Sequence, residues 1–144
     1  MSYSIDVNIL LYASDSTAHQ HGKARAFLSS RANDPGILCM SWLTIMSYMR
    51  IVTHSGIFAS PLTPQAAWQN VENLLQLPRV YLIHERENFP TDYLGETQGM
   101  SVRGNLVPVA HLAVILWQNG VKQFYTNDSD FRNFGFLELI DPLV

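Results

Sequence analysis

The stretch SIDVNILLYA, residues Ser4–Ala13, decides the fold. Its apolar run predicts a short buried strand over Tyr3–Asp6, which leads at once into a helix over Asn8–Ser14. A charged side chain inside such an apolar stretch needs a compensating partner. Asp6 is therefore the first candidate for a functional site. Asn8 is a candidate either to hydrogen-bond that site or merely to cap the helix.

Predicted strands and helices alternate along the whole chain on the C-terminal side of this stretch. The other expected strands are Ile37–Met40, Arg79–Ile83, Lys122–Thr126 and a short Leu137–Ile140, and the other expected helices are Ala18–Ser30, 42–54, Pro64–Gln76, Asn88–Met100 and 108–119. In the helix that Ser41 caps, Trp42, Ile45, Met46, Met49 and Val52 are expected to be buried. The alternation predicts an α/β fold with a three-layer α/β/α architecture and a central parallel sheet of four to five strands, in one domain over residues 1–144.

Composition narrows the class of protein. The chain has 144 residues, is 47% hydrophobic and only 15% charged. So few charges cover a small globule poorly, which predicts an apolar patch buried against a second subunit or a partner; a somewhat larger core is the alternative. One cysteine excludes an internal disulfide, and the N-terminus has no basic start or cleavage site of a signal peptide. This cysteine usage fits a reduced, cytoplasmic setting. No apolar run is long enough to span a bilayer.

Acidic residues follow two of the expected strands. The first strand ends at Asp6, and the fourth is followed by Asp128 and Asp130. Ligand sites of parallel α/β sheets lie at the carboxyl ends of the strands. Crowded carboxylates repel one another unless a cation neutralises them, and their oxygens suit Mg²⁺ or Mn²⁺. The alternative is that Asp128 and Asp130 merely shape a turn.

The last helix carries a residue that does not suit its place. In NLVPVAHLAVILWQNG, Asn105–Gly120, Pro108 fits the first helical position and Gly120 fits the left-handed position past the helix end. Val109, however, occupies the first turn, where free N–H groups favour Asp, Glu or Ser.

Four motifs in order resemble those of the PIN-domain nucleases, and within them the VapC toxins of bacterial toxin–antitoxin pairs. They are SIDVNILLYA with Asp6, RGNLVPVAHLAVI, YTNDSDF with Thr126, Asp128 and Asp130, and the terminal DPLV. The resemblance covers nearly the whole chain. It implies a PIN-like fold, a metal-dependent endoribonuclease, a VapB-type antitoxin as partner and a homodimer.

The same resemblance assigns residue roles. Asp6 would be a direct metal ligand, Asp128 would ligate the metal or orient its water, Asp130 would support the site from its rim, and Thr126 and Asn8 would orient these groups. Three arginines are candidate phosphate contacts, namely Arg50, Arg103 and Arg132.

Two positions depart from the family pattern. Val109 stands where the family has a metal-binding Asp, and Ser47 stands where many relatives have Glu, although some subgroups lack it. We therefore predict weak Mg²⁺ binding and impaired RNA cleavage. Two origins of Val109 are open, a selected or engineered inactivating change and natural decay of the gene.

Two rival functions follow from the same residues. A non-catalytic PIN module would still dimerise and hold the antitoxin, and would act through the operator-binding complex. A phosphate-accepting receiver domain would need a second acidic residue beside Asp6 and an Asp after the third strand, where the chain has His84 instead.

Overall fold

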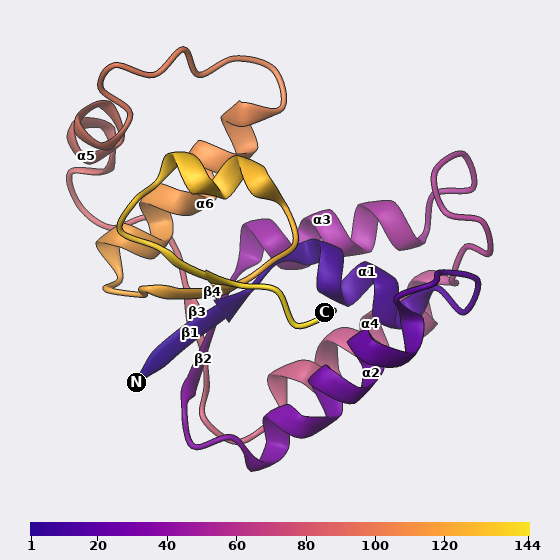
Figure 1. Cartoon of the computed structure of the whole chain (residues 1–144). Coiled ribbons are helices and arrows are strands. Elements are labelled where there is room, and N and C mark those ends of the chain that lie inside the picture. Colours follow the sequence, from indigo (N-terminus) through magenta and orange to yellow (C-terminus); the bar gives the residue numbers. More distant parts are fainter.

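A five-stranded sheet lies at the centre of the protein, whose computed structural model describes residues 1–144 (Figure 1). The strands are β1 (Ser2–Ile5), β2 (Ile37–Ser41), β3 (Val80–Ile83), β4 (Gln123–Tyr125) and β5 (Glu138–Ile140). They are arranged in the order β3-β2-β1-β4-β5, and every neighbouring pair is parallel. The predicted parallel sheet is confirmed, including its short fifth strand.

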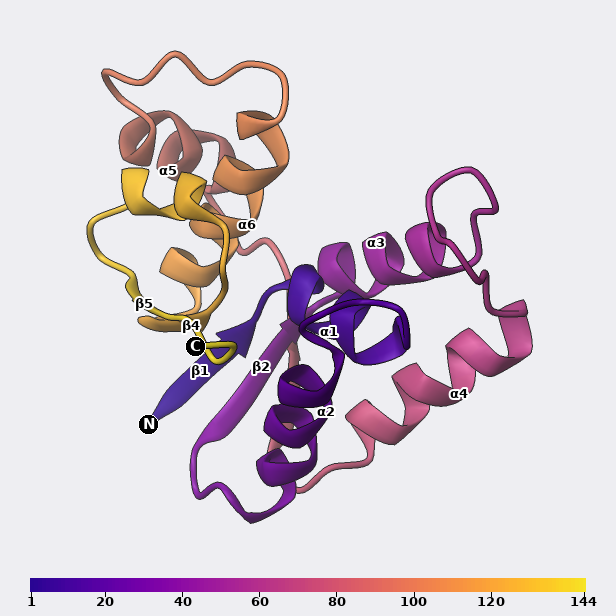
Figure 2. The same ribbon diagram turned by 45° about the vertical axis from the view of Figure 1, so that its right-hand side comes forward.

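Helices cover both faces of this sheet. They are α1 (Val7–Ser14), α2 (His21–Ser30), α3 (Trp42–Val52), α4 (Pro64–Leu75), α5 (Phe89–Glu96) and α6 (Leu106–Gln118), with short 3-10 turns η1 (Arg31–Asn33) and η2 (Ser129–Asn133). In Figures 1 and 2, α1 to α4 lie on one side of the sheet and α5 and α6 on the other. The predicted three-layer α/β/α architecture is therefore confirmed.

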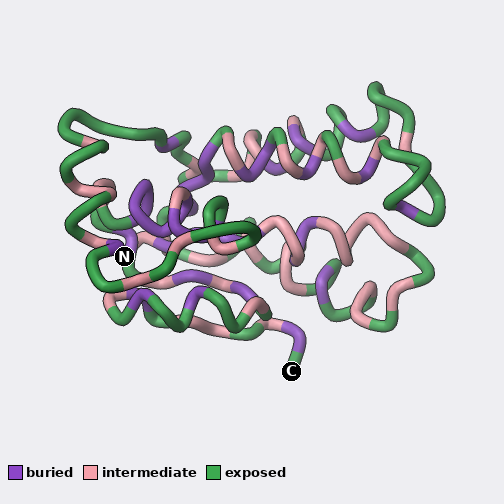
Figure 3. Tube along the Cα trace, turned by 90° about the horizontal axis from the view of Figure 1, so that it is seen from above, coloured by how far each residue is buried: buried purple, intermediate pink, exposed green.

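Two apolar cores separate the three layers. Successive side chains of a strand point to opposite faces, so Leu38 and Met40 of β2 join the core under α1 to α4, whereas Cys39 between them joins the core under α6. Seen from above, the buried residues follow the inward sides of the helices, and most of the connecting loops are exposed (Figure 3).

The strand order creates a switch point between β1 and β4. From β1 the chain moves outward to β2 and β3, and it then returns through α5 and α6 to place β4 on the other side of β1. In open parallel sheets, ligands bind at the carboxyl ends of the two strands that flank such a point. The fold thus places the ends of β1 and β4 at the position where a site is expected.

Several helix boundaries differ from the prediction because of local hydrogen bonds. α1 begins at Val7, since the Asp6 carboxylate caps it. α2 begins at His21 and not at Ala18, because the Asp15 side chain accepts hydrogen bonds from Thr17 and holds a turn there. α5 ends at Glu96, where the Thr97 hydroxyl bonds back to the Tyr93 carbonyl.

α6 begins two residues earlier than predicted, at Leu106, so Pro108 is its third residue. Its missing N–H still falls among the first-turn donors that have no partner within the helix. Gly120 has a positive φ of 70°, as predicted. Val121 N–H bonds to the Leu116 carbonyl and Gly120 N–H to the Trp117 carbonyl, the paired contacts of a Schellman motif.

The predicted burial of α3 is only partly right. Ile45 and Val52 are buried, but Trp42 is 40% exposed and Met46 48% exposed. Helical periodicity places them near the apolar stripe, yet no other element of the chain covers that side of α3.

None of the helices combines the length and the hydropathy that crossing a membrane requires.

Candidate active site

Asp6 lies at the carboxyl end of β1 and is nearly enclosed, with 5% of its surface exposed. One carboxylate oxygen, Oδ1, accepts the Val7 N–H at 2.7 Å and so caps α1. The other, Oδ2, accepts the Thr126 hydroxyl at 2.7 Å, from a residue 120 positions away in sequence. The strand-to-helix junction and the end of β4 therefore fix this carboxylate from two sides.

Thr126 continues the chain of contacts toward Asp128. Its Oγ1 accepts the Asp128 N–H at 2.9 Å, and the Asp128 carboxylate in turn accepts the Asp130 N–H at 2.9 Å. This second contact starts η2. Asp6, Thr126 and Asp128 thus form one continuous hydrogen-bonded arrangement across the switch point.

Burial dominates the electrostatics of Asp6. The pKa of the Asp6 carboxyl is raised to about 6, mainly by burial and to a smaller extent by the neighbouring Asp128 charge, against the lowering effect of the hydrogen bonds from Thr126 and Val7. Ionising a buried carboxyl beside a second carboxylate is costly. A bound cation would lower this cost by neutralising the negative charge.

Val109 is the fourth residue of α6 and 7% exposed. Because α6 leads back into the parallel strand β4, its first turn lies at the carboxyl edge of the sheet, the same edge as Asp6 and Asp128. The Val109 side chain belongs to the apolar core that also contains Leu112 and Phe131. It contributes hydrocarbon where the other two positions contribute oxygen.

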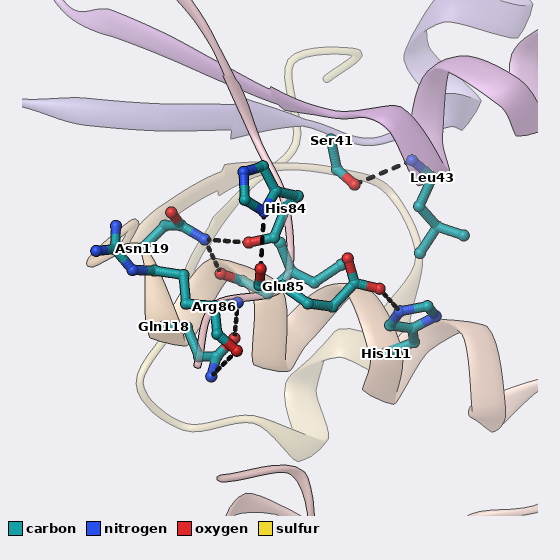
Figure 4. Close-up of polar contacts among 9 residues, drawn as sticks. Ser41, Leu43, His84, Glu85, Arg86, His111, Gln118 and Asn119 are labelled. Atoms are coloured by element: carbon teal, nitrogen blue, oxygen red, sulfur yellow. Dashed lines mark hydrogen bonds and ion pairs between the residues drawn. The ribbon is translucent and has the colours of Figure 1, made fainter. Parts of the chain in front are cut away.

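The position of α6 is fixed by the loop that follows β3 (Figure 4). His111 Nε2 lies 2.8 Å from Glu85 Oε2, the Gln118 side chain accepts the Arg86 N–H at 2.8 Å, and Asn119 donates to the His84 carbonyl at 3.0 Å. The His111 side chain stays partly exposed beside Glu85. These contacts tie the middle and the C-terminal end of α6 to the loop after β3.

The other predicted site residues are spread over this edge and beyond it. Asp130 is exposed, and Asn8 donates to Asn127 Oδ1 at 3.3 Å. Arg103 and Arg132 are exposed in the segments that precede α6 and follow β4. Ser47 is half-buried in the middle of α3. Arg50 lies eight residues into α3, about 12 Å from its first residue, so the structure does not bring it to the carboxyl edge.

Two residues at the site were missed by the sequence reasoning. Asn127 links Asn8 to the Tyr12 hydroxyl, to which its side chain donates at 3.4 Å. Asn127 adjoins Asp128 in the YTNDSDF motif, which is a signal that points to it. Nothing in the sequence pattern singles out Tyr12.

The residues present meet only part of what a divalent cation requires. Asp6 and Asp128 supply hard oxygen ligands of the correct kind. No group of three or more His, Cys, Asp or Glu side chains lies close enough together to hold a metal ion. Val109, in the first turn of α6, supplies no ligand atom.

A parallel α/β/α sheet with the buried Asp6 and the half-buried Asp128 at its switch point is the arrangement expected of a PIN-type fold. Solved structures share it: VapC20 of Mycobacterium tuberculosis, described as a sarcin–ricin loop cleaving toxin, has a TM-score of 0.68 at 16% identity, with 94% of this chain and 97% of that one covered. VapBC2 of Rickettsia felis, bound to a promoter DNA fragment, has a TM-score of 0.67 at 16% identity, with 97% and 98% covered.

Curated relatives are similar over the full length. Ribonuclease VapC48 of Mycobacterium tuberculosis is 32% identical over 142 residues, which are 99% of this chain and 98% of the relative. Ribonuclease VapC43 of the same organism is 30% identical over 139 residues, with 96% and 94% covered. No family model matches the chain. The chain belongs to the VapC family.

Proposed function

We propose that this protein is a VapC-type endoribonuclease toxin that uses a divalent cation, Mg²⁺ or Mn²⁺, is neutralised by a VapB-type antitoxin, and is catalytically impaired by Val109. The observation that carries the proposal is the Asp6–Thr126–Asp128 arrangement at the switch point of a full-length relative of named ribonucleases. Residues 1–144 would act as one domain in the cytoplasm.

Each residue of the site would have its own role in cation or RNA binding. Asp6 and Asp128 would hold the cation, and Thr126 would keep the Asp6 carboxylate in one orientation. When bound, the cation activates a water and neutralises charge that develops on the scissile phosphate. Arg103 and Arg132 would contact RNA phosphates, for which guanidinium groups are suited. Asp130 and Asn8 would support the rim, and Arg50 would contact RNA farther away.

Val109 explains why we expect impairment. A valine supplies no ligand atom, and its branched side chain fills space with hydrocarbon where a carboxylate would reach the cation. The two remaining carboxylates must then bind the cation alone, with about one unit of negative charge less than a three-carboxylate site. Ser47 removes a further carboxylate relative to many family members.

The direct test is RNA cleavage by Val109→Asp, measured with Mg²⁺ or Mn²⁺ on total RNA and transfer RNA. We expect the variant to cleave and the parent to cleave slowly or not at all. Val109→Asn is the matched control, because it restores polarity and size without the charge. Adding Asp6→Asn to Val109→Asp should abolish the gain. Equal cleavage by the parent and by Val109→Asp would refute the proposed role of residue 109.

The second candidate function is a non-catalytic module that binds the antitoxin and acts through the operator-binding complex. The specific observation in its favour is again Val109, which removes a ligand while the fold around α6 stays complete. Failure of Val109→Asp to cleave any RNA, together with a stable antitoxin complex, would favour this module over the nuclease.

A groove between α1, α2, α3 and α4 supports the antitoxin proposal. It encloses about 530 Å³ and is lined by apolar side chains that include Leu28, Ile45 and Leu74. Arg25 lies on its rim, exposed and without an ion pair. This combination suits an amphipathic segment of the antitoxin whose apolar face fills the groove and whose acidic side chain pairs with Arg25.

Co-expression with the short neighbouring reading frame tests this assignment. Gel filtration should give a complex with the parent chain, and Leu28→Asp combined with Arg25→Glu should dissociate it. Glu96→Gln, a change at the half-buried last residue of α5, away from the groove, is the control that should leave the complex intact. Retention of the complex by the double variant would contradict the groove assignment.

We also propose a homodimer, supported by the exposed apolar side chains of Trp42 and Met46. These residues are one helical turn apart on α3 and present hydrocarbon that the chain itself leaves uncovered. Sedimentation equilibrium should report a dimer for the parent and a monomer for Trp42→Glu combined with Met46→Glu. A monomeric parent would contradict this part of the proposal.

A further inference from the structure

A hollow of about 390 Å³ opens beside Asp128, between the segment that follows β4, η2 and β5. Its lining includes the polar side chains of Asn127, Asp128, Arg132 and Asp141 and the apolar side chains of Phe134 and Leu139. The volume is in the range typical of small-molecule sites. Thr126 and Asp128 belong to both the hollow and the proposed metal site, so the two are continuous.

The polar groups around this hollow are only partly engaged. One oxygen of Asp128 accepts the Asp130 N–H, and one oxygen of Asp141 accepts the Leu143 N–H at 2.9 Å. The structure records no hydrogen bond for the second oxygen of either carboxylate, and no ion pair or hydrogen bond for the Arg132 guanidinium. Without a bound cation, one oxygen of Asp128, one oxygen of Asp141 and the Arg132 guanidinium are therefore free to meet a ligand; with the cation on Asp128, the Asp141 oxygen and the guanidinium remain free.

This combination of groups matches a nucleoside attached to a phosphate. Apolar surface suits the flat face of a base, the free carboxylate oxygens accept hydrogen bonds from base amino groups and ribose hydroxyls, and a guanidinium binds phosphate. Because the free oxygens of Asp128 and Asp141 are hydrogen-bond acceptors, a base that presents an amino group can donate to them. A base that presents a carbonyl oxygen at the same place is repelled.

We propose that this hollow is a nucleotide subsite of the RNA-binding surface, selective for a base with an exocyclic amino group. The assignment rests on the proposed endoribonuclease function, since it places this nucleotide next to the phosphate that a cation on Asp6 and Asp128 would neutralise. It also gives a role to Asp141 of the terminal DPLV motif, which the metal site does not use.

Nucleotide binding to the parent chain, measured by NMR titration in EDTA, tests the subsite without any cleavage. CMP and UMP are the decisive pair, because the cytosine amino group at C4 is replaced by a carbonyl oxygen in uracil. We expect saturable shifts of backbone amides between residues 127 and 141. CMP should bind about tenfold more tightly than UMP, since an unpaired or repelled polar group costs more than 1 kcal/mol.

Variants separate the subsite from general electrostatics. Asp141→Asn keeps the acceptor for Leu143 N–H but converts the free oxygen into a donor, so the preference for CMP should fall to within about twofold. Arg132→Gln should weaken CMP and UMP equally, by about tenfold. Glu138→Gln is the matched control: it removes the same charge from neighbouring β5 without lining the hollow.

The outcomes distinguish this inference from the proposed function. No saturable shifts in the hollow, or equal effects of Asp141→Asn and Glu138→Gln, would overturn the subsite even if Val109→Asp cleaves RNA. Selective CMP binding together with an inactive Val109→Asp would support a nucleotide site and overturn the nuclease proposal.

Discussion

Two parts of the carboxyl edge of the sheet contribute different chemical groups. The ends of β1 and β4 keep their chemistry, because Asp6, Thr126 and Asp128 remain joined by hydrogen bonds of 2.7 to 2.9 Å. The first turn of α6 contributes only hydrocarbon, from the buried Val109, and the loop after β3 holds this helix at His111 and at its C-terminal end. The comparison teaches that apolar packing and backbone ties position this edge, and that the ligands are an addition to it.

The largest expected effect comes from replacing the hydrocarbon of Val109 by a carboxylate. Val109→Asp should bind Mn²⁺ at least about a hundredfold more tightly than the parent, because even outer partners of metal ligands change affinity by 10- to 100-fold. Isothermal titration calorimetry measures the change. Val109→Asn should stay close to the parent, and an unchanged dissociation constant for Val109→Asp would show that α6 does not reach the cation.

A second variant breaks the arrangement on the strand side. Thr126→Val removes the hydroxyl that donates to Asp6 and accepts from Asp128 N–H, and it leaves both groups without that partner. We expect the free energy of unfolding at pH 7 to fall by about 2–3 kcal/mol, measured by urea denaturation. Thr126→Ser keeps the hydroxyl and should lose much less; equal losses would indicate that the methyl group matters and the hydrogen bonds do not.

The pH dependence of stability sharpens the contrast between a buried charge and buried hydrocarbon. Burial raises the pKa of Asp6 from 3.8 to about 6, so the folded protein binds this proton more tightly than the unfolded chain. Its contribution to stability is therefore fully present below about pH 4 and is lost as the pH rises to about 6, by up to about 3 kcal/mol.

Asp6→Asn removes this ionisation. In EDTA at pH 8 we expect the variant to be more stable than the parent by about 1–2 kcal/mol, or roughly 2–8 °C in the melting temperature. At pH 4 the two proteins should melt at similar temperatures. Lower stability of Asp6→Asn at pH 8 would show that the Asp6 charge stabilises the folded protein.

The smallest effect is expected at the rim. Asp130 is exposed and its carboxylate has no hydrogen bond within the chain, so Asp130→Asn should change the free energy of unfolding by no more than about 0.5 kcal/mol. In the Val109→Asp background it should reduce cleavage far less than Asp6→Asn does. A loss as large as that of Asp6→Asn would move Asp130 into the metal site.

Much of the fold follows from local signals. The strand-to-helix junction at Asp6, the Thr63 cap with Pro64 after it, and the left-handed Gly120 could all be predicted, because each depends on residues within a few positions. The exposure of Trp42 and Met46 could not. Burial of a helix stripe depends on which elements cover it, and this is decided by packing between segments far apart in sequence.

The sequence by itself determined which residues have the chemistry for a site: two acids at strand ends, a hydroxyl beside one of them, and a valine where the helix start favours a carboxylate. Only the tertiary structure decided how these groups act on one another. Strand order joined Asp6 to Thr126 across 120 positions and buried its charge, and chain return placed Asn127 against Asn8 and Asp141 beside Asp128. Local propensity does not predict such contacts, because they form only when the sheet brings residues that are far apart in sequence close together.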